Sequence, residues 1–233
     1  MQWVDDAIVR GARPFGEGKL VAELFAREHG RFGGVVHGGR RAQPLLQAGN
    51  VVHAGWKARL SEHLGFFNPL EMQEPHATRL LNDPIALAGL SSAVALIRGA
   101  TPERQPYPAL YDALIVLIEA MPHADIWPAL YTRFELGLLA SMGYGLDLTR
   151  CAVTGATGKL AWVSPRTGRA ASYEAGAPHA ELLLRLPPFL IDPDAELESG
   201  DVADAFALSG HFLERRLFDQ KGEGLPDARR RLI

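Results

Sequence analysis

Basic side chains are concentrated at the start of the chain, and the chemistry they offer is the binding of phosphate. Residues 1–60 carry nine Lys and Arg against five Asp and Glu, a net charge of +4, whereas the whole chain carries −3 and the remainder therefore −7. Guanidinium and ammonium groups bind phosphate through charge-assisted hydrogen bonds, and an arginine can make two at once. This pattern favours a small nucleic-acid-binding module joined to an acidic part with another role.

Eight of these basic residues are candidates for contact with a phosphate backbone, because a positive groove along a strand needs several cations. Arg40 and Arg41 are the strongest pair, since they follow Gly38-Gly39, where glycine lets a backbone approach a phosphate. The alternatives are an ordinary Gly-Gly hairpin loop for this segment and a solvated barrel surface for the whole set. The candidates are Arg10, Arg13, Lys19, Arg31, Arg40, Arg41, Lys57 and Arg59.

Aromatic side chains are the second requirement, because unpaired bases stack on exposed rings. Phe15 is favoured by its place in the turn Arg13-Pro14-Phe15-Gly16, whereas Trp56 is assigned to the core. The stacking candidates are Trp3, Phe15, Phe32 and Phe66.

Other patterns that could support catalysis are weaker. The chain has no G-x-x-x-x-G-K-[ST] loop, and Gly89–Ala93, close to a G-x-S-x-G elbow, lies inside a helical pattern. Cys151 has no obvious catalytic partner. Five histidines lack the spacing of a metal site and are interpreted as polar strand residues. We therefore predict no enzyme activity, no catalytic residue, no metal and no cofactor. The histidines are His29, His37, His53, His63 and His76.

Short strands with glycine turns must carry the basic residues. A two-residue period in the fourth strand is the clearest, and it places alternate residues in a core and on a basic solvent face. The strands are expected at Asp5–Ala12, Lys19–Arg27, Arg31–His37, Asn50–Leu60 and Gly65–Met72. The core set of the fourth strand is Val52, Ala54, Trp56, Ala58 and Leu60, and the solvent set is His53, Gly55, Lys57 and Arg59.

Helices are expected from about residue 80 onward. Asn82-Asp83-Pro84 is a helix start, and this helix should run to about Arg98. Apolar residues at i, i+3 and i+4 predict further helices over 110–121, 131–142 and 202–217. Residues 143–190 are expected to be irregular. The polar end from Lys221 is expected to be mobile. Its Arg229-Arg230-Arg231 run is either a solvated terminus or an additional set of phosphate contacts.

The composition and the first residues predict a cytoplasmic protein. The single cysteine excludes an intramolecular disulfide and favours a reducing compartment. The first residues, with Asp5 and Asp6, lack the apolar stretch of a signal peptide. No apolar run approaches the roughly 20 residues that span a bilayer, so no membrane contact is expected.

Several short motifs, in order along the whole chain, resemble the bacterial recombination mediator family RecO. The first part contributes Asp6–Arg13, Phe25–Gly30 and the glycine-arginine turn Val35–Arg41. The later part contributes the leucine-rich segment Leu136–Gly143 and the segment Leu146–Cys151.

The resemblance implies an N-terminal OB-fold, a helical C-terminal domain and, often, a zinc ribbon between helices. It implies a nucleoid-associated protein that binds single- and double-stranded DNA and anneals complementary strands. It also implies help in loading RecA onto DNA coated by single-strand-binding protein, together with RecR. The C-terminal tail of single-strand-binding protein would dock between helices. Possible anchors for that tail are Arg79, Arg98, Arg133, Arg215 and Arg216.

The zinc ribbon of the family is not supported by these residues. Zinc-bearing relatives use two C-x-x-C pairs, whereas the first pair here is Cys151-Ala152-Val153-Thr154 and the second region, 168–173, has no cysteine. A tetrahedral zinc site needs four good ligands, and His179 does not supply the missing ones. We expect a degenerate, metal-free insertion at about residues 148–180.

The predicted fold class is α+β: a five-stranded OB-fold barrel, residues 1–78, and a helical domain, residues 79–233, with the irregular insertion. Three alternatives remain open. One is a generic OB-fold protein that binds RNA, and another is a non-catalytic adaptor whose barrel binds protein. The third is a metal-dependent hydrolase that uses the histidines.

Overall fold

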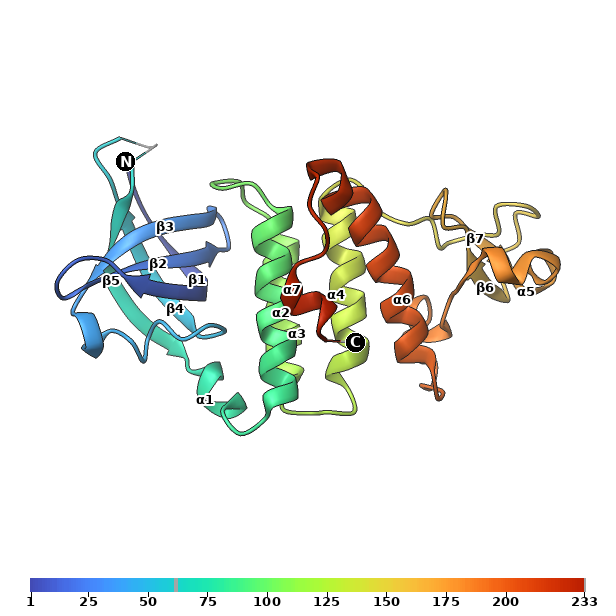
Figure 1. Cartoon of the computed structure of the whole chain (residues 1–233), viewed down its shortest axis with the longest axis horizontal. Helices are drawn as coiled ribbons and strands as arrows, with labels where there is room; N and C mark the ends of the chain where they lie inside the picture. The colour runs from blue at the N-terminus through green and yellow to red at the C-terminus, as the bar shows by residue number, and fades with distance from the viewer. Residues whose placement is uncertain (61–62, 233) are drawn as a thin grey trace. The chain divides into compact units, whose positions relative to one another are not determined.

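The structure is a computed structural model that describes residues 1–60 and 63–232. The chain forms two compact units, Met1–Pro122 and His123–Ile233, and each is described by itself (Figure 1). The domain boundary expected after residue 78 lies inside the first unit and stays a prediction.

Five strands close into a barrel at the start of the first unit. The strand order is β1-β2-β3-β5-β4, and pairing of β1 with β4 completes the closure. Among the described residues of this barrel, β3 and β5 are the one pair of strands that run parallel, at Gly34–Gly65 and Val35–Phe66. This arrangement confirms the expected OB-type barrel. The strands are β1 Gln2–Pro14, β2 Lys19–Ala26, β3 Gly30–His37, β4 Val51–Lys57 and β5 Gly65–Glu74.

The barrel core follows the predicted two-residue period through most of β4. Trp56 is 1% exposed, and its indole Nε1 donates to the Gly33 carbonyl over 3.0 Å. The prediction for Leu60 is wrong: the strand ends at Lys57, and Leu60 is 47% exposed. Gly55 was expected to face solvent but is buried. The backbone at Asn68 packs so closely against it that a Cβ on Gly55 would lie 2.7 Å from the Asn68 carbonyl oxygen. The core members from β4 and its end are Val52, Ala54, Trp56 and Ala58.

Three helices complete the first unit. The helix predicted after Asn82-Asp83-Pro84 is confirmed as α2, because the Asp83 carboxylate accepts the backbone N–H groups of Ile85 and Ala86. The near-match to a nucleophile elbow lies within this helix, so it forms no strained turn. The helices are α1 His76–Leu80, α2 Pro84–Ala100 and α3 Pro108–Ala120.

The second unit is built on α4, Trp127–Ser141, and α6, Asp201–Leu213, which continues as a π-helical segment Glu214–Phe218. Both lie where the apolar spacing predicted helices. Tyr131 of α4 stacks on Phe206 of α6 with ring centroids 5.4 Å apart. The two helices therefore share an apolar core.

The segment between these helices contains more regular structure than the sequence predicted. A three-stranded sheet of order β7-β6-β8 replaces part of the expected irregular region. The strands are short, and glycine and proline interrupt the sequence around them. The two-residue alternation of apolar and polar residues is therefore too brief to predict them. Their bounds are β6 Leu160–Val163, β7 Ala170–Ser172 and β8 Leu184–Arg185, and α5 spans Tyr173–Gly176.

The polar end of the chain is folded rather than extended. Its helix α7, Asp227–Arg230, places the Arg229 side chain in the interior with no exposed area. Arg229 pairs there with Glu135 of α4, so neither alternative from the sequence, a solvated terminus or a phosphate contact, holds for this residue. Arg230 and Arg231 remain exposed.

Candidate nucleic-acid interface

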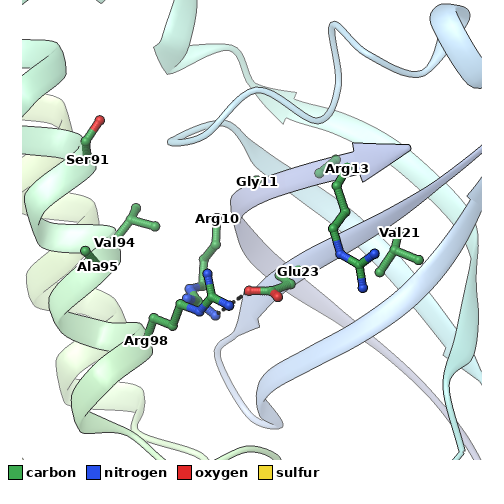
Figure 2. Close-up of a pocket in the computed structure, with 10 residues that line it drawn as sticks. Arg10, Gly11, Arg13, Val21, Glu23, Ser91, Val94, Ala95 and Arg98 are labelled. Carbon is green, nitrogen blue, oxygen red and sulfur yellow. Dashed lines mark ion pairs between the residues drawn. The ribbon is translucent and has the colours of Figure 1, made fainter. Parts of the chain in front are cut away.

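Five arginines line two adjoining hollows between the barrel and α2 within the first unit. β1 supplies Arg10 and Arg13, β3 supplies Arg31, the end of α2 supplies Arg98, and the following loop supplies Arg104. The hollows have volumes of about 310 and 430 Å³. We call this set the arginine pocket. Figure 2 shows Arg10 and Arg98 extending toward each other from the strand and the helix.

Two glutamates are the only carboxylates among the residues that line these hollows within the described part of the chain. Glu23 of β2 pairs with Arg10, with 3.2 Å between Arg10 Nη1 and a Glu23 carboxylate oxygen. Glu103 lines the larger hollow. Five guanidinium groups therefore face two carboxylates, which leaves the pocket strongly positive.

Arg10 is the deepest of the five. Its side chain is 3% exposed, and burial, followed by the nearby charge of Arg31, lowers the pKa of Arg10 to about 10. Burial also lowers the pKa of Arg31. Both side chains stay charged at neutral pH, so the pocket holds buried positive charge that has too few partners.

The loop after α2 is hydrogen-bonded to β3, and this holds Arg104 at the edge of the larger hollow. The Arg104 backbone N–H donates to the Arg31 carbonyl over 2.9 Å. Gly30 has φ +75°, and a Cβ there would lie 1.9 Å from the Gln105 carbonyl oxygen, so only glycine permits this approach. The Arg104 guanidinium lies 5.5 Å from the Phe32 ring centroid.

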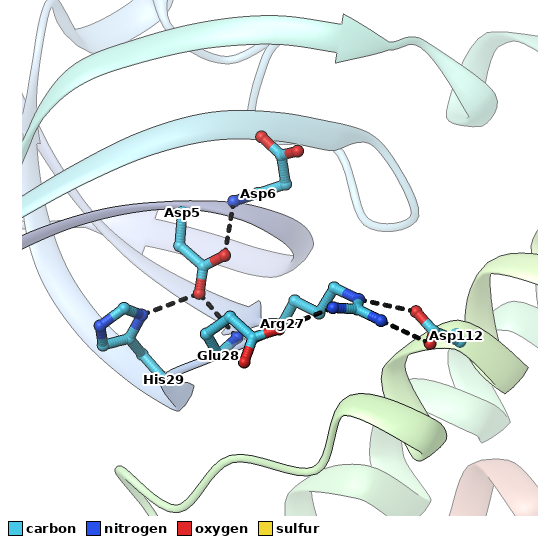
Figure 3. A network of polar contacts seen from close by, with 6 residues as sticks. All are labelled: Asp5, Asp6, Arg27, Glu28, His29 and Asp112. Atoms are coloured by element: carbon cyan, nitrogen blue, oxygen red, sulfur yellow. Dashed lines mark hydrogen bonds and ion pairs between the residues drawn. The ribbon is translucent and has the colours of Figure 1, made fainter.

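A polar network ties the same unit together on the side of α3. Arg27, the residue directly after β2, forms two hydrogen bonds of 2.9 Å to the Asp112 carboxylate of α3 (Figure 3). Nearby, Asp5 accepts a hydrogen bond from the Glu28 backbone N–H and lies 2.8 Å from His29 Nδ1. Arg27 thus forms an ion pair between the end of the β-hairpin strand β2 and helix α3.

The eight predicted residues fall into three groups rather than one groove. Arg10, Arg13 and Arg31 belong to the arginine pocket. Lys19, Arg40 and Arg41 form a second group, the turn cluster. Lys57 and Arg59 form a third, the end pair.

The turn cluster lies where the β1–β2 turn meets the segment after β3. Lys19 pairs in register with His37, and a Cβ on Gly39 would lie 3.4 Å from Gly18. Arg40 and Arg41 are exposed on a short 3-10 helix, Gly39–Arg41, so this segment is a helical turn and not the ordinary hairpin loop that was the alternative interpretation.

The end pair lies at the opposite end of β1. Lys57 pairs in register with Gln2, whereas Pro14, at the far end of the same strand, pairs with Leu20. The Ala58 N–H donates to the Met1 carbonyl over 3.1 Å, which holds Lys57 and Arg59 beside the chain start. Both side chains are exposed.

Only two of the four predicted stacking rings are available. Phe15 is 44% exposed in the β1–β2 turn, beside the turn cluster, and Phe66 is 42% exposed beside the end pair. Trp3 and Phe32 are buried at 8% and 4%, so their assignment as exposed stacking rings is wrong. Both pack against Trp56 in the barrel core.

Sequence reasoning missed two members of the pocket. Arg98 was considered only as an anchor for a protein tail, and Arg104 was not singled out at all. Neither lies in the basic first sixty residues, and only folding of α2 and its loop onto the barrel brings them to Arg10. The one signal in the sequence was the position of Arg98 in the last turn of a predicted helix.

The other possible tail anchors are partly occupied. Arg133 donates from Nε to the Phe189 carbonyl over 3.1 Å, and Arg216 donates to the carbonyls of Tyr144 and Thr167 over 3.0 and 2.8 Å. Arg215 is exposed. Arg79 lies 3.8 Å from Glu74.

The turn at Cys151 does not fit a zinc ion. The Thr154 backbone N–H lies 3.5 Å from Cys151 Sγ, and the Cys151 N–H donates to the Ala156 carbonyl over 2.7 Å. Within residues 1–60 and 63–232, no group of three or more His, Cys, Asp or Glu side chains is placed to hold a metal. Hydrogen bonds of the chain itself hold this turn.

No helix among the described residues is long and apolar enough to cross a membrane.

Comparison with known proteins gives one family over almost the whole chain. Residues 1–76 match the family model "Recombination protein O N terminal", and residues 81–223 match "Recombination protein O C terminal". The chain is 49% identical over 237 residues to a DNA repair protein RecO of Rhodospirillum centenum, with 100% of this chain and 94% of that protein covered.

Two further relatives carry the same name. A DNA repair protein RecO of Hyphomonas neptunium is 46% identical, with 100% of this chain and 97% of that protein covered. One of Phenylobacterium zucineum is 48% identical, with 98% and 95% covered.

Proposed function

The chain belongs to the RecO family of DNA repair and recombination proteins, and on this premise we propose that its barrel binds single- and double-stranded DNA. The arginine pocket is the observation that carries the proposal, because it sets five guanidinium groups against two carboxylates. Backbone phosphates supply the missing negative charge. The turn cluster and the end pair extend the contact along the barrel surface.

Strand annealing follows from this electrostatic contact without catalysis. Cations on the barrel neutralise one strand and lower its repulsion of a second strand. Base pairing then supplies the sequence recognition, and no nucleotide needs to be hydrolysed. The exposed rings of Phe15 and Phe66 would hold unpaired bases by stacking.

The helical domain is proposed to bind the protein partners. These are RecR and the C-terminal tail of single-strand-binding protein, and RecA is loaded indirectly onto the coated strand. Arg215 is the exposed anchor candidate of the second unit. The site of action would be the cytoplasm, at the nucleoid.

Fluorescence anisotropy of a labelled single-stranded oligonucleotide tests the proposal. Arg40→Glu/Arg41→Glu reverses two charges of the turn cluster, and Arg13→Gln/Arg98→Gln removes two from the pocket. Each should weaken binding of every sequence to a similar extent, because phosphate contacts carry no sequence information. Arg166→Gln, an exposed change in the second unit, is the matched control.

The outcomes separate this function from the alternatives. Binding that survives both double changes would place DNA elsewhere on the protein. Stronger binding of a matched RNA strand would favour an RNA-binding role. Absence of any salt-sensitive oligonucleotide binding would favour an adaptor that binds protein.

A further inference from the structure

The arginine pocket contains polar atoms that the folded chain leaves without partners. Nε of Arg10 and Nε of Arg31 are buried and have no hydrogen-bond partner among the residues that the structure describes. A buried donor without a partner destabilises the folded state, because it has lost its hydrogen bonds to water. Such a cost at two neighbouring cations points to an anion that the pocket is built to receive.

The pocket is also deeper than contact with a passing DNA backbone requires. Arg10, 3% exposed, lies beneath the more exposed Arg13 and Arg98. Arg10 lines both hollows, so a phosphate that contacts its guanidinium must enter one of them. An internal phosphodiester is joined to sugars on both sides, whereas a terminal phosphate is joined on one side only and can enter.

Charge makes the same distinction. An internal phosphodiester carries one negative charge. A terminal phosphate carries about 1.5 to 2 at neutral pH, with three strong acceptor oxygens. Five guanidinium groups with two glutamates leave a positive excess that suits the more highly charged group.

We infer that the arginine pocket binds the terminal phosphate of a DNA strand, with Arg10, Arg31 and Arg98 as its ligands. This inference rests on the proposed function and adds to it a preference for phosphorylated strand ends. The ligand chemistry is a phosphate monoester, which a free phosphate shares. In a repair protein, such a site would direct binding toward broken or processed ends.

The test compares oligonucleotides of one sequence that carry a 5′-phosphate, a 3′-phosphate or only hydroxyl ends. Anisotropy should show about tenfold tighter binding for one of the phosphorylated strands, the value of one charge-assisted hydrogen bond. Arg98→Gln should bring the ratio of the affinities close to one. Arg98 is exposed on α2, and its backbone carbonyl still accepts from Arg31, so the fold should be kept.

Two further variants sharpen the result. Glu23→Gln removes the carboxylate that pairs with Arg10, so it should increase the preference for a phosphorylated end. Arg166→Gln removes one exposed charge from the second unit and should leave the ratio unchanged. A thermal melt of each variant confirms that it is folded.

Failure of the inference differs from failure of the proposed function. Equal affinity for all three strands would overturn the inference and leave DNA binding intact. Binding of none of them would overturn the proposed function. A melting temperature that inorganic phosphate raises in wild type but not in Arg98→Gln, without any preference for phosphorylated ends, would assign the pocket to free phosphate and overturn the terminal-phosphate inference.

Discussion

The buried pair between Glu135 of α4 and Arg229 of α7 gives the sharpest prediction about stability. Neither side chain has exposed area. Arg229 Nη2 donates to Glu135 Oε2 over 3.0 Å and to the Phe206 carbonyl over 3.1 Å, and Ser209 Oγ donates to the same carboxylate over 2.6 Å. The Arg229 guanidinium also lies 4.7 Å from the Phe206 ring centroid. The last helix of the chain therefore depends on one cation in the core.

Removal of that cation alone should be costly. Arg229→Met fills much of the space but leaves the Glu135 carboxylate buried without its counter-charge. Breaking a buried pair in this way costs about 3–5 kcal/mol, whereas replacing both partners by apolar residues is often close to neutral. The double variant Glu135→Leu/Arg229→Met should therefore recover most of the lost stability, despite having two changes in the core.

The loss of stability in Arg229→Met relative to wild type should also depend on pH. Burial raises the pKa of Glu135, and the bond to Arg229 opposes this shift. In Arg229→Met the opposing interaction is lost, so the folded-state pKa rises further above the unfolded value of about 4.3. A raised carboxyl pKa favours the folded state at low pH, and this advantage is lost as pH rises toward the folded pKa. The deficit of Arg229→Met against wild type should be smaller at acidic than at alkaline pH.

Urea unfolding followed by circular dichroism measures these quantities. Arg230→Met, an exposed change one residue later in α7, is the control and should alter stability little. A deficit for Arg229→Met below about 1 kcal/mol, the range of exposed pairs, would refute the reasoning. A double variant less stable than Arg229→Met would refute it as well.

Three further predictions concern packing and the cysteine turn. Gly65→Ala places a Cβ 2.4 Å from the Trp56 ring and should cost about 1–3 kcal/mol by urea unfolding, whereas Gly158→Ala, in open space, should cost far less. The Cys151 thiol is 1% exposed and should react with iodoacetamide slowly in the folded protein and rapidly in urea; similar rates would contradict its burial. Hydrogen bonding to Thr154, and then to Ser172, lowers the pKa of Cys151 to about 6. Thr154→Val should therefore move the pH midpoint of the slow reaction upward, and an unchanged midpoint would contradict the part of Thr154 in this shift.

Elements with a strong local signal could be predicted from the sequence. The five strands lie within a few residues of their expected places, because glycine turns separate short apolar runs. The start of α2 was fixed by Asp83 and Pro84, a cap and a first-turn proline whose preferences are local. The period of β4 failed at Gly55, which packs against Asn68, and beyond Lys57, where the strand ends without a marked signal in the sequence.

The candidate site was only partly predictable, because three-dimensional contacts decide which arginines meet. Arg10 and Arg98 are far apart in sequence and reach the same hollow only through packing of α2 near β1. Arg229 looked like part of a solvated basic tail, and only its partner Glu135, on a distant helix, makes it a core residue. A charge run cannot show which of its members has a buried counter-ion.

Salt dependence of single-stranded DNA binding tests the central claim most directly. For wild type, the affinity should fall steeply and linearly on a log–log plot, since each phosphate contact on a single strand contributes a slope of about 0.7. Arg13→Gln/Arg98→Gln, which removes two cations of the arginine pocket, should make the slope shallower by about 1.4, and Arg166→Gln should leave it unchanged. An affinity that salt does not alter, or an equal slope in the double variant, would contradict DNA binding by the arginine pocket.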